Sequence, residues 1–147
     1  MVKQLILPLI SYAGTVYSCL DSASLHKLQV AFNFATRYVF HLKKFDHVSE
    51  WRKQILGCTI ENYLCIRNCI FLHKIIHTQS PPYLFHKLQF SRSGRNPILM
   101  MPKFKYSCSE KLFFVNAVRL WNSLPNIIRV IEGSREFKTS VTRHFSN

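Results

Sequence analysis

Acidic residues are scarce in this chain of 147 residues. Twenty Lys and Arg face only seven Asp and Glu, which gives a formal net charge of +13 at neutral pH. No two carboxylates have a spacing typical of a general acid/base pair or of a two-metal site, so the sequence gives little support to independent catalysis. The excess of positive charge favours a polyanionic partner, with nucleic acid first and an anionic membrane second.

Glycine is also rare, with four residues in the whole chain. The sequence contains no glycine-rich phosphate loop and no Gly-x-Ser-x-Gly motif, which removes two common routes to an enzymatic function. The five cysteines are an odd number without a compact framework spacing, which favours a reducing compartment. We therefore expect an intracellular protein, nuclear or cytoplasmic, that is not secreted.

One spacing resembles a metal site, namely Cys65, Cys69, His73 and His77, each four residues from the next. Two such side chains on a helix can share a zinc ion, but four on one straight helix rise too far for a single tetrahedral site. We therefore expect the two cysteines in the core, the two histidines at the polar edge of the helix, and no metal or other cofactor.

The N-terminal segment, 3–19, is apolar nearly all round and predicts a helix buried against other elements. The uncharged run from Leu5 to Leu20 faintly resembles a signal peptide or anchor. Because Pro8 interrupts its apolar part and a single lysine precedes it, a buried helix is the better interpretation. We expect no membrane association and no small-molecule substrate.

Hydrophobic periodicity predicts a mainly α fold, a bundle of about five or six helices with one irregular or short-strand basic segment near 88–108. Asp21 or Ser22 begins a helix whose stripe is widened by Phe34 and Tyr38. Further helices are expected over 49–55, 59–78, 109–124 and 134–145, and a short strand over 98–101 or 103–106. We expect one domain, 1–147, with a helical half (1–78), a proline-containing basic connection (79–108) and C-terminal helices (109–147).

In the helix expected to begin at Ser109, apolar residues fill one arc of the helical wheel. Large aromatic residues at helical spacing usually belong to a core. The predicted core residues of this helix are Phe113, Phe114, Leu120 and Trp121.

The stretch between Glu61 and Glu110 contains no acid. Its later part alternates basic and aromatic residues, a pattern in which cations neutralise phosphates while rings stack on bases or brace a loop. The candidate phosphate contacts are Arg92, Arg95, Lys103 and Lys105. The alternative is a solvated basic surface whose counter-charges lie elsewhere in a larger parent protein.

Several blocks occur in an order that resembles the region after the polymerase palm in reverse transcriptases of jockey-like non-LTR retrotransposons. They include Phe45-Asp46-His47-Val48-Ser49, Leu56-Gly57, His73-Lys74-Ile75-Ile76-His77, Ser80-Pro81-Pro82-Tyr83-Leu84 and Phe137-Lys138. The most specific block is Ala117-Val118-Arg119-Leu120-Trp121-Asn122-Ser123-Leu124-Pro125. The chain departs from the family after Leu56-Gly57, where Cys58-Thr59-Ile60 replaces a Trp-Leu-Pro-like continuation.

The resemblance implies the thumb and the region beyond it of an RNA-directed DNA polymerase that depends on magnesium in its full form. The catalytic aspartates would belong to domains upstream of Met1, so we expect a fragment without polymerase activity of its own. Its partners would be those domains and an RNA or DNA template–primer. The competing hypothesis is a free-standing basic helical module that binds protein or an anionic surface.

Overall fold

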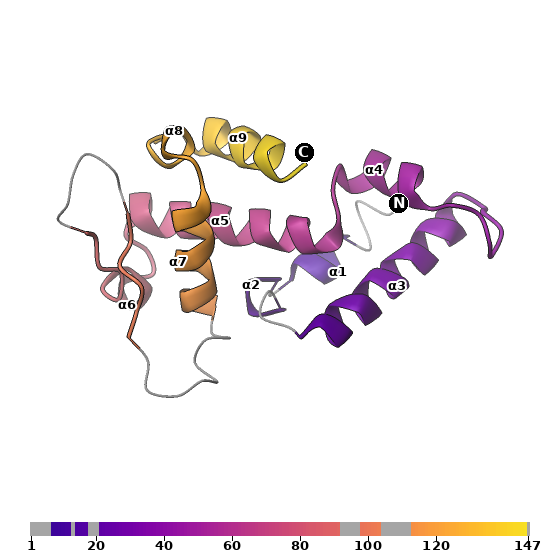
Figure 1. Cartoon of the computed structure of the whole chain (residues 1–147), viewed down its shortest axis with the longest axis horizontal. Coiled ribbons are helices and arrows are strands. Elements are labelled where there is room, and N and C mark those ends of the chain that lie inside the picture. Colours follow the sequence, from indigo (N-terminus) through magenta and orange to yellow (C-terminus); the bar gives the residue numbers. More distant parts are fainter. Residues whose placement is uncertain (1–6, 13, 18–20, 92–97, 104–112, 147) are drawn as a thin grey trace.

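The computed structural model describes residues 7–12, 14–17, 21–91, 98–103 and 113–146, and these are mainly α-helical, as predicted. The longest helix, α5 (Ile60–Thr78), runs through the middle of the molecule. The C-terminal helix α9 (Ser134–Ser146) lies along one side of α5, and α7 (Phe113–Ser123) crosses it (Figure 1). Short helices α1 (Leu7–Ser11) and α2 (Gly14–Tyr17) lie near the first half of α5, with α2 in contact with it.

The ends of α5 follow from local chemistry. The Thr59 hydroxyl oxygen accepts a hydrogen bond from the backbone N–H of Asn62 at 3.2 Å, which caps the N-terminus. Gly57 precedes it with a φ of 74°, a left-handed conformation that ends α4 (Ser49–Leu56) and suits glycine. At the other end Gln79 is left-handed, and Pro82 opens the one-turn helix α6 (Pro82–Phe85). The predicted bounds of α5 are confirmed.

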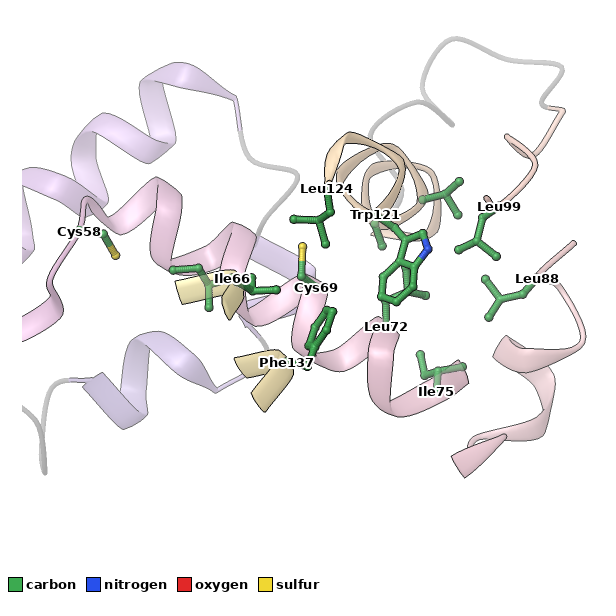
Figure 2. Close-up of a cluster of buried hydrophobic side chains, with 13 residues drawn as sticks. Cys58, Ile66, Cys69, Leu72, Ile75, Leu88, Leu99, Trp121, Leu124 and Phe137 are labelled. Carbon is green, nitrogen blue, oxygen red and sulfur yellow. The ribbon is translucent and has the colours of Figure 1, made fainter. Parts of the chain in front are cut away.

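The main core forms where α5 meets α7 and α9. Figure 2 shows Cys69, Leu72 and Ile75 of α5 with Trp121 of α7 and Phe137 of α9 gathered in this cluster. Leu88 and Leu99 of the connecting segment also contribute to it. The short helix α8 (Asn126–Arg129) links α7 to α9, so the C-terminal elements fold back over the central helix.

A second, smaller cluster lies where α3 (Ser22–Val39) meets α4 and the start of α5. Phe32, Ile55, Ile60 and Leu64 form its buried part. The two clusters share α5, whose early residues serve the smaller one and whose later residues serve the main one. The central position predicted for α5 therefore has a direct cause, since this helix is covered on several sides.

The first helix was predicted wrongly. Among the described residues of the 3–19 segment, two short helices replace one long one, and α1 contains no buried residue. Leu9 and Tyr12 are exposed. Uniform apolarity along this segment gave no period from which a boundary or a buried face could be derived.

The basic connection contains an isolated antiparallel bridge between Phe90 and Leu99 in place of a regular strand. Ser91 N–H donates to the Ile98 carbonyl at 2.9 Å, and Met100 N–H donates to the Gln89 carbonyl at 2.7 Å. The second predicted strand, 103–106, and the predicted helix start at Ser109 lie largely or wholly outside the described residues. The described residues around this bridge are therefore irregular, with one paired point.

The stretch Ser49–Thr78 is, within the described part of the chain, the one long and apolar enough to cross a membrane by length and composition. Of its most apolar window 44% is buried inside the protein. A core helix passes the same test, and α5 occupies the core.

Candidate nucleic-acid interface

The predicted phosphate contacts are only partly described by the structure. Lys103 is exposed, whereas Arg92, Arg95 and Lys105 lie outside the described residues. The structure does describe the residues on either side of the 92–97 segment. Leu99 is buried and the flanking residues Ser91 and Ile98 are hydrogen-bonded to each other, so both ends of the 92–97 segment start from one anchored point.

Asn122 provides that anchor from α7. Its side-chain nitrogen donates to the Leu99 carbonyl at 2.7 Å, and its side-chain oxygen accepts from the Leu99 N–H at 3.1 Å. The amide therefore satisfies both backbone groups of one residue, as a neighbouring strand would. Nothing in the sequence pattern indicated this pairing of Asn122 with Leu99.

A second group of cations lies on the outer face of α9. Arg135, Lys138 and Arg143 line a shallow depression of about 500 Å³ together with Thr139 and Thr142. Counted together with the two threonines, these residues follow three- and four-residue spacings that place them on one helix face, while Phe137 and Val141 on the opposite face are buried. The threonine hydroxyls donate to backbone carbonyls of their own helix, so the cations are the groups available to a ligand.

Most of the cations that the structure describes have no ion-pair partner. Within the residues that the structure describes, the sole ion pair joins Lys53 to Glu50 at 3.9 Å, and both side chains are largely exposed. A pair of this kind contributes little to stability. The exposed cations of α9 and the exposed Lys103 therefore keep the positive potential that the acid-poor composition predicted.

Of the two cysteines in α5 that were expected in the core, Cys69 is a core residue, whereas Cys65 is only half-buried and lies outside the buried part of the cluster. Burial raises the pKa of the Cys65 thiol to about 11 and that of Cys69 to about 12, with smaller contributions from nearby acidic groups. Both thiols therefore stay protonated at neutral pH and are poor nucleophiles and poor metal ligands.

His73 was placed wrongly by the sequence, which put it at the polar edge of the helix. It is 2% exposed and stacks on Phe137 with ring centroids 4.0 Å apart, next to His77 at 4.2 Å. Its Nε2 lies 2.8 Å from the Ile131 carbonyl, and because a carbonyl only accepts, Nε2 carries the hydrogen. Burial lowers the His73 pKa, the hydrogen bond to Ile131 opposes that effect, and the proximity of His77 adds to it.

No three His, Cys, Asp or Glu side chains gather to hold a metal ion anywhere in the described ranges. The magnesium implied by the resemblance therefore finds no fitting ligand set in this part of the chain. Asp46 has a structural role instead, because its carboxylate accepts the Lys43 N–H at 2.7 Å and closes the turn after α3.

The block of highest specificity in the resemblance builds the main core. Trp121 is 1% exposed and its ring stacks on that of Phe137 at 5.7 Å. Ala117, Val118 and Leu124 are buried beside it, while Phe113, Phe114 and Leu120 are half-buried and pack against the same cluster. These side chains hold α7 against the rest of the main core.

Comparison of the chain with protein-family models, with curated proteins and with solved structures finds no match.

Proposed function

We propose that this chain is the C-terminal, post-palm part of a jockey-like non-LTR retrotransposon reverse transcriptase, in which it helps to bind the template–primer. It would not be an enzyme by itself, since the catalytic aspartates and their magnesium would belong to the rest of the polymerase. The ordered blocks of the sequence support the family. The unpaired surface cations support the binding role.

The observation that carries the proposal is the contrast between +13 formal charges and a single, exposed ion pair among the described residues. Cations that already have carboxylate partners gain little by meeting phosphates, whereas unpaired ones release the counterions condensed on the nucleic acid. Phosphate contacts position a protein without reading bases, so the expected binding depends on salt and little on sequence.

Two groups of cations are expected to contribute, the connection (Arg92, Arg95, Lys103 and Lys105) and the face of α9 (Arg135, Lys138 and Arg143). The test is the slope of log affinity against log salt concentration for a DNA duplex and an RNA–DNA hybrid. Replacing the four cations of the connection by Gln should flatten the slope by roughly three or four units, since each phosphate contact contributes about 0.9.

The matched control is Lys53→Gln, which removes one exposed cation that already has a carboxylate partner. This variant should leave the slope nearly unchanged, and scrambling the base sequence should leave affinity nearly unchanged. Anionic vesicles serve as the competing polyanion, and weak, reversible adsorption is expected because the connection offers no long apolar face to insert. Tight vesicle binding, together with an unaltered nucleic-acid salt slope in the fourfold variant, would refute the proposal.

A further inference from the structure

One face of α3 is apolar and uncovered. Val30, Phe34 and Tyr38 follow one another at intervals of four residues and so form one ridge along the helix. Phe34 is 72% exposed and Tyr38 is 75% exposed. The sequence analysis expected both aromatic residues to widen the apolar stripe of this helix. Only the other side of the helix, which contains Phe32 and Thr36, is buried against the smaller cluster.

This ridge and the turn that follows α3 together line a groove. His41 has a φ of 54°, and the Leu42 N–H donates to the Arg37 carbonyl at 2.9 Å. This left-handed ending turns the chain back beside the helix. The resulting groove has a volume of about 790 Å³ and is lined by the apolar ridge, by Leu42, and by the cations Arg37 and Lys44.

The charges of the groove are of one sign. Arg37 and Lys44 lie toward the C-terminal end of α3, and no acid lines the groove. Arg37 donates to the Asp46 carbonyl through Nη2 at a long 3.4 Å, while its Nε is covered and has no hydrogen-bond partner. A buried guanidinium nitrogen without a hydrogen-bond partner is energetically unfavourable. A carboxylate on a binding partner would draw the Arg37 side chain toward itself and accept a hydrogen bond from Nε.

We infer that this groove binds an acidic amphipathic helix of another protein or protein domain. A ridge of apolar side chains four residues apart is matched by an apolar stripe on a facing helix. Acidic residues at one end of that helix would meet Arg37 and Lys44. This binding is separate from the phosphate contacts proposed above and does not depend on them.

Two other occupants fit less well. A second copy of the chain would bring a further +13 charges to a cationic site, which opposes association. A single-stranded nucleic acid could stack bases on Phe34 and Tyr38, but the aliphatic Val30 and Leu42 complete the groove and offer no stacking surface. An exposed apolar patch with a charged rim is characteristic of protein–protein contacts.

The experiment is a selection followed by a binding measurement. A displayed library of helical peptides, each about 16 residues long so that a helix can form, carries mixed apolar, acidic and basic positions. It is selected on the full chain and counter-selected on the Phe34→Ser/Tyr38→Ser variant. The enriched peptides should have net negative charge and apolar residues at spacings of three and four.

The tightest peptide is then measured by fluorescence anisotropy. Phe34→Ser/Tyr38→Ser should weaken its binding at least about tenfold, and Lys44→Glu should weaken it several-fold. The matched control is Tyr83→Ser/Ile127→Ser, which removes two exposed apolar side chains outside the groove and should leave affinity unchanged. Thermal melting verifies folding, and Val30→Gln on the same ridge replaces the double variant if its melting temperature falls.

Three outcomes would overturn the inference. The selection could enrich nothing beyond the counter-selected background, or it could enrich neutral or basic peptides. The control variant could lose affinity as strongly as the groove variant, which would mean nonspecific apolar binding. An oligo(dT) strand could displace the peptide and itself bind at least about tenfold more weakly to Phe34→Ser/Tyr38→Ser, which would identify a nucleic-acid site instead.

Discussion

At the scale of single residues, Trp121 distinguishes a structural role from a binding role. Its indole is buried between α5 and α9, where it stacks on Phe137 and lies 6.4 Å from the ring of His73. Trp121→Ala should therefore cost about 3–5 kcal/mol of unfolding free energy, enough to unfold a marginal domain. Urea denaturation measures this loss. A variant that melts like the parent chain but no longer binds nucleic acid would contradict the assignment.

His73 predicts a dependence of stability on pH. Burial lowers its pKa in the folded chain below the ordinary value near 6.5, so the unfolded chain takes up a proton first as the pH falls. The stability that depends on neutral His73 is therefore fully present above about pH 6.5 and decreases below it. Denaturation midpoints at pH 7.5 and pH 5.5 measure the difference.

The comparison variant is His73→Phe, which keeps a ring stacked on Phe137 but cannot titrate. The loss of stability between the two pH values should be smaller in this variant than in the parent chain. A variant with the same pH dependence as the parent would mean that a group other than His73 causes the effect.

At the scale of elements, the Asn122 amide is the clearest point to test. Asn122→Asp keeps the shape of the side chain, but it removes the donor to the Leu99 carbonyl and places a negative oxygen beside it. An unsatisfied carbonyl of this kind should cost about 1–3 kcal/mol. The midpoint of urea denaturation measures this loss, because the Asp oxygen can still accept from the Leu99 N–H and only the bond to the carbonyl is removed. Asn126→Asp, the same change at an exposed position on α8, is the control and should leave the midpoint unchanged.

The helices that the sequence predicted best are those with a clear period and a chemical boundary. For α5, the Thr59 cap and the preceding glycine defined the start of the helix, and the prolines after Thr78 defined its end. For α9, the apolar spacing of Phe137 and Val141 defined the buried face. The 3–19 segment offered neither. The one-turn helices α6 and α8 are too short to produce a period, so no pattern could indicate them.

The sequence predicted the positive charge of the candidate site but not where the site lies in the fold. Composition indicated an acid-poor surface, but the pairing of Asn122 with Leu99 and the gathering of cations on α9 depend on contacts between distant residues. The face of α3 was misplaced for a related reason. Phe34 and Tyr38 extend a helical stripe that is apolar on more than one side, and periodicity alone does not tell which side a neighbouring element covers.

At the scale of the whole molecule, we expect the isolated chain to extend no primer and to hydrolyse no nucleic acid. Two-metal chemistry requires carboxylates that hold magnesium at the 3′ end, and the sequence offers no such pair. A primer-extension assay with template, primer and magnesium, compared with a mock preparation, measures this. Template-dependent products above the mock level would overturn both this expectation and the proposal that catalysis belongs to the rest of the polymerase.

The two tryptophans lie beside different clusters, so their fluorescence can report on the two halves of the molecule separately. Trp51 lies 4.6 Å from Phe40 beside the smaller cluster, whereas Trp121 belongs to the main one. Trp51→Phe and Trp121→Phe would therefore each leave one indole whose emission reports on one half of the molecule. Coincident denaturation curves would show that α5 couples both halves into one cooperative unit, and separated curves would show that each half unfolds at its own denaturant concentration.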